Sequence, residues 1–295
     1  MSAKRFVFNG VDTYVLDDPS FVFDPAKTFD CGQCFRWNSC SDGSFRGIAG
    51  GRALTLRRSG TSVFVKCTAG VPDAHFCVFL DRYFDVGTDY SFLETLLAEK
   101  DRVMKEAVKC SSGIRLLRQD IFETVISFII SANNNIPRIK KCIENVCFNY
   151  GNRIGDGLYA FPAPEALASA DPKQLTEICK VGYRGPYIVN TAERFASGAV
   201  SEDSLMQKAP CDAAKYILGL QGVGPKVLNC IMLFTGLDRS SFPVDVWVER
   251  MMGELYGFEN CDRTYLEKYG KSYFGEYAGL AQQYLFYYIR QIHCK

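Results

Sequence analysis

The sequence predicts an α+β protein, in which an N-terminal antiparallel β-sheet domain with helices precedes a domain that is almost entirely helical. Two observations lead to this prediction. The first third alternates apolar and polar residues in short segments separated by glycine-containing turns, as strands with one solvent-facing side do. From about Gly113 onward, apolar residues recur at helical spacing. We therefore expect a sheet domain over residues 1–112 and a helical domain over residues 113–295.

The totals indicate a folded protein of ordinary composition. Its 295 residues are 47% hydrophobic and 23% charged, which is enough for a substantial core. Because the formal net charge is only +1, a nucleic-acid site would need its basic residues gathered on one face. The N-terminus lacks a signal-peptide core and no run is long enough to cross a bilayer, so we expect an intracellular protein with no membrane partner.

Thirteen scattered cysteines indicate reduced, mostly buried thiols. Cys31 and Cys34 form a C-x-x-C pair, but the segment after it continues into a strand, and only Cys40 lies nearby. A redox or zinc role is therefore disfavoured. The C-terminal region holds only Cys261 and Cys294, too few for an iron–sulfur cluster. With two histidines in the chain, any chemistry should use Lys, Asp, Glu or Cys.

The strands and helices can be placed from their turns and caps. The strand segments are RFVFNGVDTYVL, FRW, SFRGIA, ALTLRR and SVFVKC, and the turns between the later ones are SDGS, GG and RSGTS. Helical spacing begins between Val71 and Ala107. Asp120 precedes a strongly apolar helix that ends at three asparagines, and Pro137 opens the next helix. A Pro- and Gly-rich connector and further helices follow.

The most informative stretch runs from Leu218 to Glu249. Gly222 and Gly224 permit a sharp turn whose amides can approach a partner closely, and Pro225 suits the first turn of the apolar helix that follows. Free amides at a helix start form an anion site, which a nucleic-acid phosphate can occupy.

Lys226 lies in the first turn of this helix, and Cys230 lies one turn later on the same face. The helix dipole and partial burial both favour the neutral amine, the form that attacks as a nucleophile. Asp245, after Pro243, is placed as the N-cap of the next helix. A cap carboxylate can also stabilise a developing cation, and the spacing does not separate the two roles. The ordinary alternative for Lys226 is a solvated surface lysine.

A helix, an L-x-G-V-G hairpin, a lysine-bearing helix and a Pro-Val-Asp loop together resemble the helix-hairpin-helix DNA glycosylase superfamily. The resemblance implies that Lys226 displaces the damaged base and forms a Schiff base with C1′ of the deoxyribose, followed by β-elimination at the 3′ phosphate. Asp245 would stabilise the positive charge that develops. The carbonyls of Leu218, Leu220 and Val223 match positions that hold a structural cation in the superfamily. No other cofactor is expected to be required.

The segment CGQCFRW resembles the G-Q-x-F-R-W signature of the 8-oxoguanine DNA glycosylase family, and further matches extend over nearly the whole chain. The resemblance implies that the Gly32 carbonyl accepts a hydrogen bond from N7–H, which 8-oxoguanine has and guanine lacks. The flipped base would stack between Cys230 and Phe286, and Gln282 would contact its Watson–Crick edge.

The same resemblance implies contacts with the surrounding DNA. Asn133 would fill the space left by the flipped base, and Tyr183 would wedge into the stack. Arg138 and Arg184 would contact the cytosine opposite the lesion. Trp247 departs from the family, in which many members have a histidine near the lesion's phosphate, so that polar contact is in doubt.

Each of these residues also has an ordinary explanation, such as a helix C-cap for the asparagines or a core position for Phe286. Their occurrence together, in the family's order, favours the functional interpretation. We predict a monomeric glycosylase and lyase that excises 8-oxoguanine from double-stranded DNA, preferably opposite cytosine. One alternative is a helix-hairpin-helix glycosylase for other damaged bases, against which Lys226 and Gly32 argue. The other is a noncatalytic DNA-binding module, which leaves Lys226 and the Gln282–Phe286 pair without a purpose.

Overall fold

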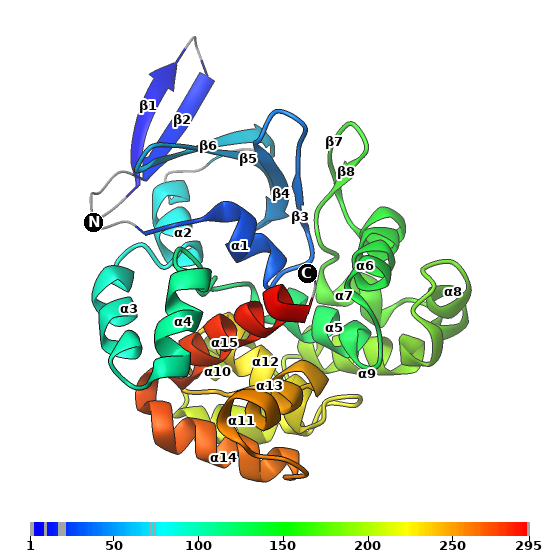
Figure 1. The fold of residues 1–295 in the computed structure, drawn as a ribbon. Coiled ribbons are helices and arrows are strands. Elements are labelled where there is room, and N and C mark those ends of the chain that lie inside the picture. Colours follow the sequence, from blue (N-terminus) through cyan, green and yellow to red (C-terminus); the bar gives the residue numbers. More distant parts are fainter. Residues whose placement is uncertain (1–2, 9–10, 17–21, 71, 73–74, 294–295) are drawn as a thin grey trace.

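The computed structural model describes residues 3–8, 11–16, 22–70, 72 and 75–293. A six-stranded antiparallel sheet precedes a large helical region (Figure 1), which confirms the predicted α+β class. In these ranges, no helix has both the length and the apolar character needed to cross a membrane.

The sheet has the strand order β1-β2-β6-β5-β4-β3. The strands are β1 (Lys4–Phe8), β2 (Val11–Leu16), β3 (Trp37–Ser39), β4 (Phe45–Ala49), β5 (Arg52–Ser59) and β6 (Ser62–Ala69). The first alternating segment folds into β1 and β2, and residues 9 and 10 between them lie outside the described part of the chain. The three predicted turns join β3 to β4, β4 to β5 and β5 to β6.

One side of the sheet is buried because apolar residues alternate along β5 and β6, where Leu54, Leu56, Val63 and Val65 are almost fully enclosed. The helices α1 (Pro25–Asp30) and α2 (Phe76–Tyr83) contribute to the same core. Their aromatic side chains, together with Trp37, exclude water from this side of the sheet.

The helical region begins after α2. Its elements are α3 (Tyr90–Ala98), α4 (Arg102–Ser111), α5 (Ile121–Ser131), α6 (Ile136–Tyr150), α7 (Pro164–Ala168), α8 (Pro172–Glu177), η1 (Gly182–Arg184), α9 (Gly185–Ala196), α10 (Glu202–Gln207), α11 (Pro210–Leu218), α12 (Pro225–Thr235), α13 (Val246–Tyr256), α14 (Arg263–Phe274), η2 (Gly275–Tyr277) and α15 (Ala278–His293). The predicted cap at Asp120 is confirmed, since its Oδ1 accepts a hydrogen bond of 2.8 Å from the Glu123 amide.

Two features differ from the simplest helical expectation. The Pro- and Gly-rich connector contains a small antiparallel ribbon of β7 (Arg153–Gly155) and β8 (Leu158–Tyr159). Segments this short carry too few residues for alternation to be recognised. The C-terminal helical run is interrupted at Gly275, whose φ of 62° lies in the left-handed region and ends α14.

A second, larger core joins the helices to part of the N-terminal domain. Cys31 and Phe35, which precede β3, are buried in it together with Phe286 of α15. In Figure 1, α15 crosses the middle of the molecule, and it packs against α4, α13 and α14. The segment before β3 is therefore held against the C-terminal helix, although the two lie at opposite ends of the sequence.

Candidate active site

The hairpin between α11 and α12 is as sharp as its glycines predict. Gly222 has φ of 84°, and a Cβ at this position would lie only 2.7 Å from Cδ2 of Tyr187. Gly224 is extended and exposed at the N-cap of α12. The chain thus turns closely against Tyr187 and then enters α12. The first backbone amides of this helix have no hydrogen-bond acceptor within the helix.

The Lys226 amine is half-buried in the first turn of α12. Its Nζ lies 5.5 Å from the centre of the Phe128 ring, and Phe128 in turn packs edge-on against Phe35, with 5.4 Å between ring centres. Phe35 belongs to the CGQCFRW segment. The structure therefore connects the predicted nucleophile to the segment predicted to recognise the base.

Asp245 caps α13, as predicted. Its Oδ1 accepts hydrogen bonds from the amides of Trp247 (3.0 Å) and Val248 (2.9 Å), which fix the carboxylate at the start of the helix. Both bonds go to the same oxygen, so the carboxylate keeps acceptor capacity for a positive charge.

Lys226 and Asp245 both influence the ionisation of one buried thiol, that of Cys230. Burial raises the pKa of Cys230, the carboxylate of Asp245 raises it further, and the Lys226 amine opposes this shift through its charge and a side-chain hydrogen bond. The thiol is therefore neutral. A buried neutral thiol suits an apolar wall better than a nucleophile, which leaves Lys226 as the reactive group of the three.

Gly32 lies directly against Phe286. Its φ of 79° is left-handed, and a Cβ at Gly32 would lie 3.6 Å from Cε1 of the Phe286 ring. Gln282 precedes Phe286 by one turn of α15 and is 3% exposed. The structure thus brings these three predicted base-contacting residues together, and stacking of a base between Cys230 and Phe286 remains a prediction.

Gln33 has a role that sequence reasoning missed. Its side chain is fully enclosed, donates to the carbonyls of Thr28 (3.0 Å) and Arg115 (2.8 Å), and accepts from the Leu117 amide (2.9 Å). These bonds fix the backbone of Gly32 from the adjacent position. The only signal in the sequence was that glutamine accompanies glycine in the recognised segment.

Asn133 occupies an exposed turn after α5 in a left-handed conformation, with φ of 51°. The side chain of Arg184 supports this turn through hydrogen bonds to its backbone. Its guanidinium donates to the carbonyls of Ala132 (3.1 Å from Nε), Asn133 (3.2 Å) and Val181 (3.0 Å), and the side chain is buried. A contact between Arg184 and the opposite base remains a prediction, and the structure adds a supporting role.

Aromatic contacts continue from this turn to the hairpin. The Arg184 guanidinium lies 4.4 Å from the centre of the Tyr183 ring, which is 57% exposed. Tyr183 packs edge-on against Tyr187, and Tyr187 contacts Gly222. Arg138 is exposed on the first turn of α6, where its amide donates to the Asn135 side chain (3.0 Å). Contacts therefore connect Asn133 to Gly222 through Arg184, Tyr183 and Tyr187.

Trp247, the departure from the family pattern, packs against two other side chains. The Arg250 guanidinium lies 5.2 Å from the centre of the Trp247 ring, and the ring of His293 lies 6.2 Å away. His293 in turn contacts Glu254 at 2.9 Å. The indole therefore has an ordered packing role beside the Asp245 cap.

The C-x-x-C pair is buried, as predicted. Burial raises the pKa of Cys31 to about 12 and the pKa of Cys34 well above its ordinary value, so both are neutral thiols. Within the described ranges, no three His, Cys, Asp or Glu side chains are arranged to hold a metal ion. Cys294, which entered the iron–sulfur argument, lies outside those ranges.

Comparison with known proteins agrees with this geometry. Residues 16–125 match the N-terminal domain of 8-oxoguanine DNA glycosylase, and residues 126–275 match the HhH-GPD superfamily of base excision DNA repair proteins. The chain is 31% identical over 278 residues to the N-glycosylase/DNA lyase OGG1 of Arabidopsis thaliana, covering 88% of this chain and 75% of the relative. A probable N-glycosylase/DNA lyase of Methanothermobacter thermautotrophicus is also 31% identical, over 72% of each chain.

Solved structures extend the likeness to the whole fold. The Clostridium acetobutylicum 8-oxoguanine glycosylase/lyase, in complex with double-stranded DNA containing cytosine opposite 8-oxoguanine, superimposes with a TM-score of 0.90. It is 34% identical, over 99% of this chain and 98% of that one. The lysine-bearing helix, the capped aspartate and the glycine against Phe286 thus occur in a chain that belongs to the 8-oxoguanine DNA glycosylase family, within the helix-hairpin-helix superfamily of base excision repair proteins.

Proposed function

We propose that this protein binds double-stranded DNA, excises 8-oxoguanine and then cleaves the strand at the resulting site. The observation that carries the proposal is the Lys226 amine in the first turn of α12, directly after a glycine hairpin, together with the Asp245 carboxylate fixed at the N-cap of α13. A noncatalytic DNA-binding module would need the hairpin but neither the amine nor the carboxylate.

The reaction follows from these groups. As the bond between C1′ and the base breaks, positive charge develops on the sugar, and the nearby Asp245 carboxylate stabilises it. The neutral Lys226 nitrogen forms a bond to C1′ as the base leaves, and the nitrogen loses one proton. The bond from C1′ to O4′ then breaks, O4′ takes up a proton, and nitrogen and C1′ form a protonated Schiff base. Withdrawal of electrons into the imine then permits removal of a proton from C2′ and departure of the 3′ phosphate.

Base choice is assigned to the segment before β3 and to α15. The carbonyl of Gly32 accepts from N7–H of the lesion, and Gln282 contacts the Watson–Crick edge. Because 8-oxoguanine differs from guanine by a donor at N7, a fixed carbonyl acceptor separates the two bases. Preference for cytosine opposite the lesion is assigned to Arg138 and Arg184, with Asn133 in the vacated space and Tyr183 in the stack.

The chemistry requires no cofactor, and a cation at the hairpin would have a structural role. The Leu220 carbonyl accepts one hydrogen bond, of 3.2 Å, from the Val223 amide. In the described part of the chain, no turn or loop bond ends on the carbonyls of Leu218 or Val223. We propose that the carbonyls of Leu218, Leu220 and Val223 hold a monovalent cation that bridges to a DNA phosphate.

Borohydride trapping tests the proposal. Duplex DNA containing 8-oxoguanine should give a covalent adduct with the wild type, and Lys226→Gln should give none, because only an amine forms the reducible imine. Lys215→Gln is the matched control, since Lys215 is exposed on the preceding helix α11 and pairs with Asp212 at 2.9 Å. It should trap as the wild type does.

The alternatives have distinct outcomes in the same assay. No adduct with the wild type would refute the lyase step. Equal or faster release of 3-methyladenine than of 8-oxoguanine would instead favour a glycosylase for other damaged bases.

A further inference from the structure

Two buried glutamines lie next to each other on α15 and are hydrogen-bonded. Gln282 and Gln283 are each 3% exposed, and Nε2 of Gln283 donates to Oε1 of Gln282 at 2.7 Å. Consecutive side chains on a helix normally point in different directions and do not meet. This bond is therefore a specific arrangement of the two side chains.

The Gln283 amide is otherwise poorly satisfied. Its Oε1 is buried and has no hydrogen-bond partner within the described structure. A buried acceptor without a partner reduces stability, and an apolar side chain of the same length would avoid this cost. Packing alone thus gives no reason for a glutamine at this position. What the Gln283 side chain does provide is the hydrogen bond to Gln282.

We propose that Gln283 is a positioning residue that fixes the orientation of the Gln282 amide and thereby selects the type of base edge that the pocket accepts. The inference rests on the proposed function, in which Gln282 contacts the Watson–Crick edge. An amide oxygen only accepts and an amide nitrogen only donates. Reversing the Gln282 amide alone would place its NH2 against the NH2 of Gln283, and reversing both amides would take from the buried Gln283 NH2 the acceptor that it now has, so the pair favours the observed orientation.

A locked amide distinguishes guanine-type from adenine-type edges. Guanine presents an acceptor at O6 beside a donor at N1–H, which matches an amide that offers a donor and a remaining oxygen lone pair in one fixed order. Adenine presents the reverse order, a donor at N6 and an acceptor at N1. Since 8-oxoadenine has the same N7–H as 8-oxoguanine, the Gly32 carbonyl does not separate these two lesions, and the amide orientation must.

The test compares two substitutions at position 283. In Gln283→Met the lock is lost, and the Gln282 amide can rotate to suit either base. In Gln283→Glu, assayed at a pH high enough to ionise the buried carboxyl, the carboxylate only accepts, so the Gln282 amide must reverse and donate to it, which favours the adenine order. Gln291→Met on the same helix is the matched control.

The readout is the ratio of single-turnover excision rates for 8-oxoguanine and 8-oxoadenine, each opposite cytosine in the same duplex. We expect the ratio to fall roughly tenfold in Gln283→Met, the effect of one hydrogen bond, and further in Gln283→Glu, while Gln291→Met keeps the wild-type ratio. The melting temperature of Gln283→Met should not fall, because the substitution removes a buried unpaired oxygen. If Gln283→Glu does not fold, Gln283→Met alone decides.

The failures are distinguishable. A wild type that does not excise 8-oxoguanine would refute the proposed function itself. An active wild type with an unchanged ratio in Gln283→Met would overturn the positioning role, even if both rates fell together, because a purely structural residue would affect the two lesions equally.

Discussion

At the scale of single residues, the two arginines predicted to contact the opposite base have different surroundings. Arg138 is exposed at the start of α6, and its side chain is available to DNA. Arg184 is 4% exposed and donates to carbonyls of the Asn133 turn. Arg184 therefore contributes to the stability of the protein, whereas Arg138 is available to act on DNA alone.

Replacing each arginine with alanine should separate these effects. Arg138→Ala should relax the preference for cytosine and change the free energy of unfolding by less than about 0.5 kcal/mol, as expected for a surface position. Arg184→Ala should also destabilise the protein by roughly 1–3 kcal/mol, because it removes the guanidinium that donates to the buried Val181 carbonyl and the partly buried Ala132 carbonyl. Excision opposite each of the four bases, with thermal denaturation, measures both. Unchanged discrimination in both variants would refute the base contacts.

At the scale of an element, the α11–α12 hairpin depends on two glycines for different reasons. Gly222 needs its left-handed φ, and its lack of a side chain allows Tyr187 to pack closely. Gly224 has φ of −96°, which other residues adopt, and a Cβ there would meet nothing within 4 Å. Only the first glycine is required by the fold of the hairpin.

Gly222→Ala should therefore destabilise the protein by about 1–3 kcal/mol, through backbone strain and the clash with Tyr187. It should also weaken binding to undamaged duplex DNA, because the amides at the start of α12 shift. Gly224→Ala is the matched control for stability and should unfold at the wild-type denaturant concentration. Equal stability of the two variants would contradict this account of the hairpin.

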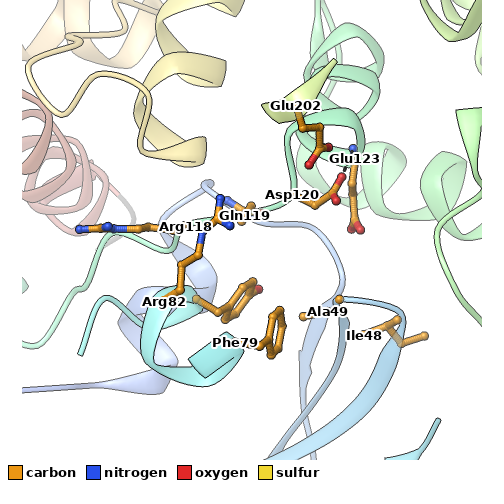
Figure 2. Close-up of a pocket in the computed structure, with 11 residues that line it drawn as sticks. Ile48, Ala49, Phe79, Arg82, Arg118, Gln119, Asp120, Glu123 and Glu202 are labelled. Carbon is orange, nitrogen blue, oxygen red and sulfur yellow. Dashed lines mark hydrogen bonds between the residues drawn. The ribbon is translucent and has the colours of Figure 1, made fainter. Parts of the chain in front are cut away.

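At the scale of the whole molecule, the two domains are joined by polar contacts as well as by the shared core. Arg36, which precedes β3, pairs with Glu144 of α6 at 2.9 Å and donates to the Tyr159 carbonyl at 2.8 Å. A cleft of about 170 Å³ lies between the end of β4, α2 and the start of α5. Figure 2 shows Asp120, Glu123 and Glu202 gathered on one side of this cleft.

The carboxyl of Glu123, which lines this cleft, makes the free energy of unfolding depend on pH. Burial raises the pKa of Glu123 from its ordinary 4.5 to about 8; the Arg36 guanidinium opposes this shift, and the carboxylates of Asp120 and Glu144 add to it. The folded protein therefore holds a proton that the unfolded chain releases between these pH values, so this group makes stability fall as pH rises through that range. Above the folded pKa the loss is complete.

A glutamine at position 123 cannot ionise, so Glu123→Gln should not lose stability in this way as the pH rises. The free energy of unfolding of the variant, relative to the wild type, should increase between pH 5 and pH 9 by an amount on the order of 1–3 kcal/mol. Urea titrations at several pH values measure it, with the exposed Glu165→Gln on α7 as control. A difference that does not change with pH would contradict the assignment.

The sequence by itself determined the fold class, the strand turns, the helix caps at Asp120 and Asp245, and the place of Lys226 in the first turn of α12. These depend on local chemistry: glycine conformations, cap oxygens and helical spacing act within a few residues. The short β7–β8 ribbon escaped prediction because its strands are too brief for a periodic signal.

The tertiary structure decided what surrounds each predicted residue. That Gly32 rests on Phe286, that Gln33 anchors it, that Arg184 is buried, and that Gln283 holds Gln282 all depend on packing between segments or on side-chain rotamers. Such contacts leave no local pattern in a single sequence, because many residue pairs could fill the same space. The candidate site residues could therefore be named from the sequence, while the contacts that hold them in place required the assembled core.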